Sequence, residues 1–145
     1  MMAGSAENGF KGQIAYTEFT KCGQPRIIGR YCSHYHMNGD VTESFARGNA
    51  VHHSMARVIT LHGVHYLTVE YNVGYQVKGH NYFIEDGIET HNVLQYNLAI
   101  SSFAASTMMQ TDMSVASFWV THPSNIFRYN HAAGSDFYGF CCWGE

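Results

Sequence analysis

A short segment ending in asparagine recurs along the chain and constrains its fold more than any other feature. Three of the four clear copies end in Tyr-Asn, and their asparagines follow one another at intervals of 23, 25 and 33 residues. The copies are Ser44–Asn49, Leu67–Asn72, Asn92–Asn97 and Asn125–Asn130. A weaker copy, Ile14–Thr20, places Thr20 in the asparagine position. Such a period is typical of repeat proteins, in which each unit stacks on its neighbours.

A second short strand precedes the asparagine segment in three of the repeats. These strands are expected at Val58–His62, Tyr82–Asp86 and Phe118–His122, and they are followed by Gly63, Gly87 and Pro123. Strands of five or six residues at this period match the coils of a parallel β-helix. The chain is therefore predicted to be all-β, a right-handed parallel β-helix of about four to five coils. An antiparallel sandwich is the alternative, but four aligned corners favour the β-helix.

The repeated asparagines have a physical role at the corners of such a fold. Asparagine tolerates the left-handed backbone conformation that a sharp corner requires. Its side-chain amide can also hydrogen-bond to the same residue in the next coil. A structural ladder is therefore expected from four residues, Asn49, Asn72, Asn97 and Asn130.

The whole chain, residues 1–145, is expected to form one β-helix segment of a larger protein. Residues 1–8 are polar and are expected to be disordered or added to the natural chain, and 101–114 to be a loop inserted at one corner. A β-helix slice leaves unpaired sheet edges. The predicted partner is therefore the rest of a parent protein or a larger assembly.

Composition narrows the remaining possibilities. The formal net charge of −3 gives no basic surface, so nucleic acid is not expected as a partner. No run of 18 apolar residues occurs, so no membrane contact is expected within this segment, and no signal peptide is visible. The four cysteines, Cys22, Cys32, Cys141 and Cys142, contain no CxxC pair, and they are either buried free thiols or include one disulfide.

Several longer blocks resemble one protein family. They include Arg30–Asp40, Ile59–Gly63, Gly79–Glu89, Phe118–Pro123 and Asn130–Ser135. Together they are similar to the β-helix region of the fibrocystin-L and cell-migration-inducing hyaluronidase family, whose members usually carry a separate G8 domain. The chain departs from the family pattern at Cys32-Ser33, where Pro-Ile is usual, and at Cys141-Cys142. The resemblance implies an extracellular or cell-surface protein.

That resemblance leaves two functions open, and the chain alone does not decide whether it is an enzyme. The first is a structural, adhesive or glycan-binding segment of a fibrocystin-L-like protein, with a polysaccharide as possible partner. The second is a part of a hyaluronan-depolymerising glycosidase.

The histidines of the predicted strands point to one candidate site. Residues two apart in a strand share a face, so His34 and His36 point the same way. Aligning the turn residues places His62, Asp86 and His122 in one column, which His36 continues. A slip of one residue would exchange Asp86 for Glu85.

This column could carry two kinds of chemistry. His36, His62 and Asp86 could hold a divalent cation, calcium or zinc. Alternatively, Asp86 and His62 could serve as catalytic base and acid on a glycan. The residues expected to contribute to binding are His34, His36, Glu85 and His122.

Tyrosines beside the corner asparagines could also meet sugars. Exposed aromatic rings stack well on sugar rings. For Tyr71, Tyr96 and Tyr129, however, the regular place beside the asparagine favours an interior stack that fills the lumen.

Overall fold

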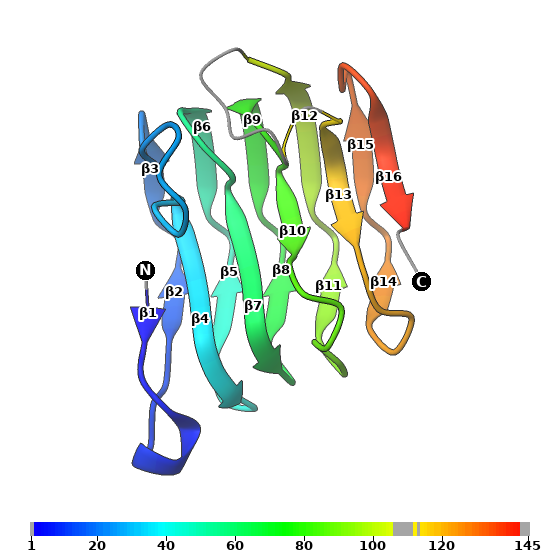
Figure 1. Cartoon of the computed structure of the whole chain (residues 1–145). Helices are drawn as coiled ribbons and strands as arrows, with labels where there is room; N and C mark the ends of the chain where they lie inside the picture. Colours follow the sequence, from blue (N-terminus) through cyan, green and yellow to red (C-terminus); the bar gives the residue numbers. More distant parts are fainter. Residues whose placement is uncertain (1, 106–111, 113, 143–145) are drawn as a thin grey trace.

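The computed structural model describes residues 2–105, 112 and 114–142. These residues form three parallel β-sheets that run side by side along one axis (Figure 1). Sheet A contains β1 (Met2–Ala3), β4 (Ser33–Asp40), β7 (Ile59–His65), β10 (Tyr82–Ile84), β13 (Ala116–Val120) and β16 (Tyr138–Cys142). Sheet B contains β2 (Gln13–Ala15), β5 (Phe45–Arg47), β8 (Thr68–Glu70), β11 (Val93–Gln95) and β14 (Ile126–Arg128). Sheet C contains β3 (Glu18–Thr20), β6 (Ala50–Ser54), β9 (Val73–Lys78), β12 (Leu98–Phe103) and β15 (His131–Ala133).

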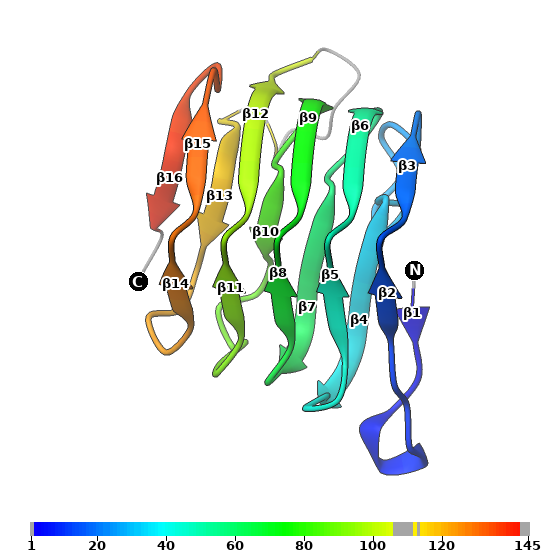
Figure 2. The same ribbon diagram turned by 180° about the vertical axis from the view of Figure 1, so that it is seen from behind.

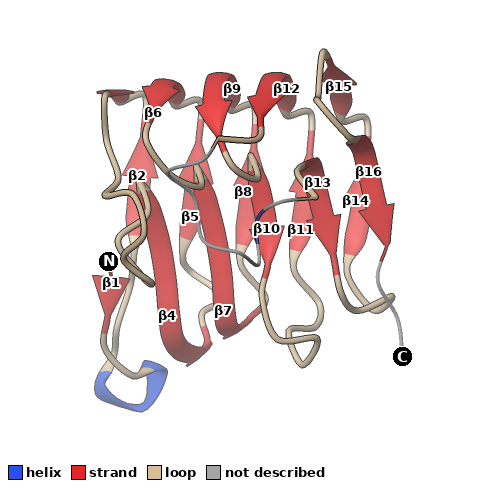
Figure 3. Cartoon of the chain, turned by 45° about the horizontal axis from the view of Figure 1, so that its top comes forward, coloured by secondary structure: helices blue, strands red, loops and turns tan. Residues whose placement is uncertain are grey.

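Every strand pairs in parallel with the strand three places further along the chain, which confirms the predicted parallel β-helix. Each coil therefore has three strands, one from each sheet, and sheets B and C face the viewer in Figure 2. The strands of sheet C were not predicted from the sequence. From β6 onward each begins at the residue after the corner asparagine, so no separate turn sequence marks where the strand starts. Figure 3 shows the stacked strands tilted by 45° from the view of Figure 1, with the short helix η1 (Ala6–Asn8) at one end.

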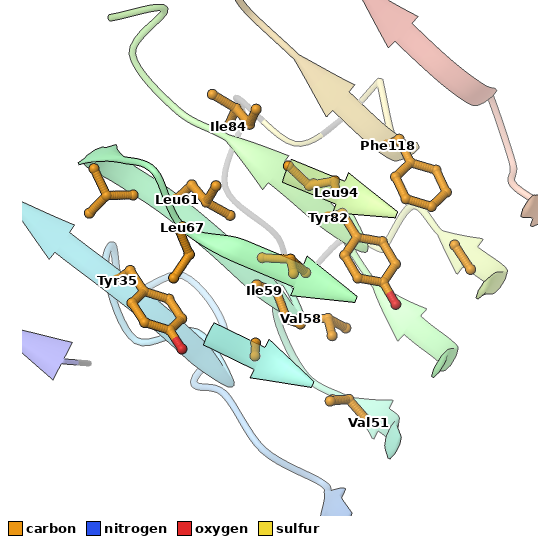
Figure 4. Packing of buried hydrophobic residues seen from close by; sticks show 14 of the residues in the cluster. Tyr35, Val51, Val58, Ile59, Leu61, Leu67, Tyr82, Ile84, Leu94 and Phe118 are labelled. Atoms are coloured by element: carbon orange, nitrogen blue, oxygen red, sulfur yellow. The ribbon is translucent and has the colours of Figure 1, made fainter. Parts of the chain in front are cut away.

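The lumen is filled by side chains that the strand registers stack from coil to coil. In sheet A, Tyr35, Leu61 and Ile84 form one row, and all three are fully buried (Figure 4). In a neighbouring row the rings of Tyr82 and Phe118 lie 4.7 Å apart and nearly parallel. Because this core continues through the coils, each coil stabilises the next.

The asparagine ladder is present as a chain of hydrogen bonds at the corner between sheets B and C, buried at the first two rungs and partly buried at the last. The Asn49 side-chain amide donates to Oδ1 of Asn72 at 2.9 Å, that of Asn72 to Asn97 at 3.0 Å, and that of Asn97 to Asn130 at 3.0 Å. Each Oδ1 also accepts the backbone N–H of the asparagine in the preceding coil. Two buried donors per coil are thus satisfied by one acceptor.

The prediction that the corner asparagine adopts the left-handed conformation is wrong, because the residue before it does so. Gly48, Tyr71, Tyr96 and Tyr129 have φ of 63°, 56°, 54° and 55°. In the first coil the equivalent of asparagine is Thr17, whose N–H donates to Asn49 Oδ1, and not Thr20, which lies in β3. The asparagines are therefore selected by their amides and not by their backbone conformation.

A second ladder lies at the corner between sheets A and B. The Asn92 side chain donates to Asn125 Oδ1 at 3.0 Å, and the Leu67 N–H donates to Asn92 Oδ1 at 2.9 Å. Here too the residue before each corner is left-handed, with φ of 61° at Tyr66 and 59° at His91. The coils are thus tied together at two corners.

The prediction that Tyr71, Tyr96 and Tyr129 fill the lumen is wrong. Their side chains are 55%, 43% and 62% exposed, because the left-handed corner directs them outward. Successive rings stack with centroids 5.0 and 4.8 Å apart and planes within 13°. Each ring thus covers a face of its neighbour, so the column presents mainly edges and hydroxyls and is a poor platform for sugar rings.

Further predictions concerned the N-terminal residues, the inserted loop, the cysteines and membrane contact. Within the range 1–8 predicted to be disordered, Met2–Ala3 pair with β4 and Ala6–Asn8 form η1. Of the loop predicted at 101–114, residues 101–103 belong to β12, and 106–111 and 113 lie outside the described residues. Cys22 and Cys32 form a disulfide, whereas Cys141 and Cys142 are free thiols. Among the described residues, no helix is long and apolar enough to cross a membrane.

Substituting one rung of the ladder should destabilise the whole stack. Asn72→Ala leaves two buried donors of Asn49 without their acceptor, so we expect a loss of about 3 kcal/mol in the free energy of unfolding. Urea-induced unfolding followed by circular dichroism measures this loss. The matched control, Asn8→Ala, removes an exposed asparagine and should change stability by less than about 0.5 kcal/mol. A loss below about 1 kcal/mol for Asn72→Ala would contradict the role of the ladder.

Candidate functional site

The outer face of sheet A carries a row of polar side chains from three successive coils. Because Tyr35, Leu61 and Ile84 point into the lumen, the residues that follow them point outward. His36 pairs with His62 in register, and the Glu85 N–H continues the ladder by donating to Leu61 O at 3.0 Å. The row is therefore His36, His62 and Glu85.

This register differs by one residue from the alignment made on the sequence, which placed Asp86 beside His62. The alignment treated Gly63 as a turn residue, but Gly63 lies inside β7. It has a positive φ of 59° at the point where the paired strand β4 has a bulge between His36 and Gly39. Thr121, not His122, occupies the corresponding place in the next coil. His122 lies in the following turn, where its Nδ1 accepts the Ser124 N–H.

Asp86 nevertheless reaches His62 from beyond the end of β10. Its Oδ2 lies 2.8 Å from His62 Nε2, while Glu85 Oε2 lies 3.8 Å from His62 Nδ1. The two carboxylates therefore approach opposite nitrogens of one imidazole. Asp86 is 45% exposed and His62 is 20% exposed, so solvent reaches this side of the site.

Three imidazoles meet at the centre of the site. His36 Nδ1 and His62 Nδ1 are 2.9 Å apart, and His34 stacks on His62 with ring centroids separated by 5.9 Å. One ring nitrogen of each histidine lies within 4.8 Å of the others. Since two neutral nitrogens cannot contact each other as acceptors, one proton or one cation must lie between His36 and His62.

The buried member of the cluster, His34, has a defined tautomer. Its Nδ1 is 3.0 Å from the carbonyl oxygen of Gly29, which only accepts, so Nδ1 carries the proton. The pKa of His34 is lowered to about 4, mainly by burial; the Gly29 hydrogen bond opposes this shift, and the nearby His36 and His62 contribute to it. The ring is therefore neutral at pH 7 and keeps a lone pair on Nε2.

A buried cation lies behind the imidazoles. The Arg57 guanidinium lies 3.7 Å from the ring centre of Phe83, donates to the Tyr31 hydroxyl at 3.0 Å, and approaches Glu85 Oε1 at 3.5 Å. It also forms a two-point ion pair with Asp112. Burial raises the pKa of Glu85, whereas Arg57 and then His62 lower it.

This supporting layer was not found from the sequence. Arg57 and Asp112 are 55 residues apart, and no local pattern pairs them. The only available signal in the sequence was that Arg57 lies two residues before the start of the apolar strand β7. The segment that covers His34, which contains Gly29 and Tyr31, lies between the disulfide-bonded Cys22 and Cys32.

The fold and the site define a class of protein, a parallel β-helix that presents a polar cluster on the outer face of one sheet. The family model described as the CEMIP beta-helix matches residues 2–143. The chain therefore belongs to the CEMIP β-helix family.

Three relatives illustrate where the chain stands in this family. It is 45% identical to fibrocystin-L of Mus musculus over 130 residues, which are 89% of this chain and 3% of that protein. It is 33% identical to the cell surface hyaluronidase CEMIP2 of Homo sapiens over 154 aligned residues, which cover 84% of this chain and 11% of the relative. A G8 domain-containing protein of Dictyostelium discoideum is 33% identical, with 86% of this chain and 13% of the relative covered. The chain thus spans a small fraction of each relative.

The site's supporting layer predicts a pH dependence of stability. His80 is fully buried in this layer, with its Nε2 3.6 Å from Asp112 Oδ1. Its pKa is lowered to about 4, mainly by burial, while Asp112 raises it and Arg57 lowers it. Below about pH 6.5 the unfolded chain binds a proton that the folded chain does not bind until about pH 4. The free energy of unfolding therefore decreases as the pH is lowered from about 6.5 to about 4. In His80→Asn, whose amide oxygen can still accept the Ala116 N–H, the fall should be shallower by up to about 1.4 kcal/mol per pH unit.

Urea-induced unfolding at pH 7, 6, 5 and 4 measures this difference. The exposed His131 supplies the matched control, because His131→Asn should leave the pH dependence as it is in the parent chain. Equal slopes for His80→Asn and the parent chain would show that His80 does not remain neutral in the fold.

Proposed function

We propose that this chain is a glycan-binding segment of the β-helix of an extracellular or cell-surface protein, and that the glycan lies on the outer face of sheet A. The observation that carries the proposal is that Asp86 contacts His62 and His62 contacts His36, and that all three side chains are at least partly exposed on a rigid face. Carboxylates and imidazoles are hydrogen-bonding partners that suit sugar hydroxyls.

The repeat supports binding of an extended polymer. Side chains of successive coils are about 4.8 Å apart along the axis, so the row from His36 to Glu85 extends over about 10 Å. A chain molecule lying along the axis would contact several coils at once. Because the backbone of each coil is fixed by its neighbours, little conformational entropy would be lost on binding.

Two further findings support an extracellular role. The Cys22–Cys32 disulfide suits an oxidising environment. One relative carries the name cell surface hyaluronidase, which makes hyaluronan the first glycan to test. In a fibrocystin-L-like parent the same rigid stack would also serve as a structural or adhesive element.

A second function, participation in glycan hydrolysis, is favoured by one contact. Asp86 holds His62 at 2.8 Å, and His62 in turn contacts His36 at 2.9 Å, an arrangement that orients a base for proton transfer. In this reading Asp86 and His62 are the catalytic pair, and Glu85 lies within reach of the same imidazole.

Fluorescent hyaluronan distinguishes the two functions. We expect the chain to retain hyaluronan without shortening it, and Asp86→Ala to weaken retention about tenfold or more, because a charged hydrogen bond is lost. Affinity electrophoresis measures retention, and size-exclusion chromatography measures polymer length.

Asp136→Ala is the matched control, because Asp136 is an exposed carboxylate between β15 and β16 whose Oδ2 accepts the Ala104 N–H and which is not part of the His36–Glu85 row. Shortening of the polymer would select the hydrolytic function. Absence of retention, or equal weakening by both substitutions, would contradict a glycan site on sheet A.

A further inference from the structure

Four donor atoms converge on one point of the outer face of sheet A. They are His34 Nε2, His36 Nδ1, His62 Nδ1 and Glu85 Oε2. They come from β4, β7 and the residue after β10, so the point lies across three successive coils. Imidazole nitrogens and a carboxylate oxygen are the ligand types that proteins use for zinc.

The separations between these atoms fit one small cation. Ligand bonds of about 2.0–2.1 Å in a tetrahedron place the ligand atoms about 3.4 Å from one another. The measured separations are 2.9 Å from His36 Nδ1 to His62 Nδ1, 3.8 Å from His62 Nδ1 to Glu85 Oε2, and 3.9 Å from His34 Nε2 to Glu85 Oε2. Ring nitrogens of the three histidines lie within 4.8 Å of one another, so small rotations of the imidazoles would close the set.

Two of the four atoms have no other use in the fold. His34 Nε2 and Glu85 Oε2 are both buried, and neither has a hydrogen-bond partner among the described residues. Leaving a buried polar atom unpaired costs about 1–3 kcal/mol. His34 is only 1% exposed, and its protonated nitrogen is already fixed on Gly29, so its lone pair is directed into the cluster.

The remaining contacts are those that orient metal ligands. Ligand histidines usually donate their second N–H to a carboxylate or a backbone carbonyl. His34 does so to Gly29 O, and His62 has Asp86 Oδ2 at 2.8 Å from Nε2. Arg57, 3.5 Å from Oε1 of Glu85, leaves the other carboxylate oxygen toward the imidazoles. A divalent cation would also balance the charges of Glu85 and Asp86.

We infer that His34, His36, His62 and Glu85 form a zinc-class metal site that links three successive coils, with Asp86 orienting His62 from outside the ligand set. Asp86, assigned on the sequence as a ligand, is therefore a positioning residue. Three nitrogens and one oxygen select zinc over calcium, which takes six to eight oxygens. The site does not depend on glycan binding, and it is tested without glycan.

Zinc binding by the full chain, prepared without a histidine tag and treated with chelator, tests this site. We expect one zinc per chain after gel filtration, counted by mass spectrometry of the metal, and one-to-one binding by calorimetry. His36→Ala/His62→Ala should lose this zinc while its circular dichroism spectrum is unchanged, because both side chains point out of the core. Asp86→Asn should weaken zinc affinity about 10- to 100-fold.

The chain offers a matched control in a second pair of imidazoles. His53 is exposed and His52 is half-buried, their Nδ1 atoms are 2.7 Å apart, and His52 Nε2 lies 2.8 Å from Glu18 Oε1. His52→Ala/His53→Ala removes the same two side-chain types and should keep the single zinc. Retention of zinc by the sheet A variant, or its loss in the control, would overturn the assignment.

Cobalt provides a readout that does not require a folded variant. Co²⁺ bound to the unsubstituted chain should give the strong visible absorption of a tetrahedral site, and excess Zn²⁺ should abolish it. A weak, octahedral-type spectrum would contradict the proposed ligand set. So would failure of the unsubstituted chain to keep any zinc.

Discussion

Stacking of one coil on the next depends on a single repeated interaction, in which a side-chain amide oxygen accepts two N–H groups of the coil before it. Asn72 Oδ1 receives both the backbone and the side-chain N–H of Asn49, and the same geometry recurs at Asn97 and Asn130. Such a bond forms only when the coils are in register. Because a slip of one residue would turn every outward side chain inward, the ladder also determines what the outer faces present.

The candidate site follows from that register. The lumen takes Tyr35 and Leu61, so the residues that follow them, His36 and His62, must project from sheet A on adjacent coils. The chain then brings two further elements to this face, the disulfide-bounded segment that buries His34 and the Arg57–Asp112 pair. Repetition thus places the imidazoles, and non-repetitive insertions give them their environment.

The same division explains what could be predicted from the sequence. The repeat revealed the parallel β-helix and the asparagine column, because both recur at a fixed period. The position of Asp86 was off by one because Gly63, a usual turn residue, lies within β7 beside a bulge. The tyrosines were placed in the lumen because nothing local shows that the left-handed residue precedes the asparagine. Arg57 and Asp112 meet only through tertiary structure.

The outer face of sheet A holds two buried polar atoms that lack hydrogen-bond partners and lie 3.9 Å apart, His34 Nε2 and Glu85 Oε2. Asparagine amides at both corners have their partners, and the Arg47, Glu70 and Gln95 side chains on sheet B bond to one another. On sheet A, by contrast, the buried atoms His34 Nε2 and Glu85 Oε2 lack hydrogen bonds although Arg57 and Asp112 are paired beside them. Two buried, unpaired atoms aimed at one point have a local cost, and costs of this kind concentrate at functional sites. A cation held by the imidazoles would offset that cost, and it would tie β4, β7 and the end of β10 together where the corner ladders do not reach.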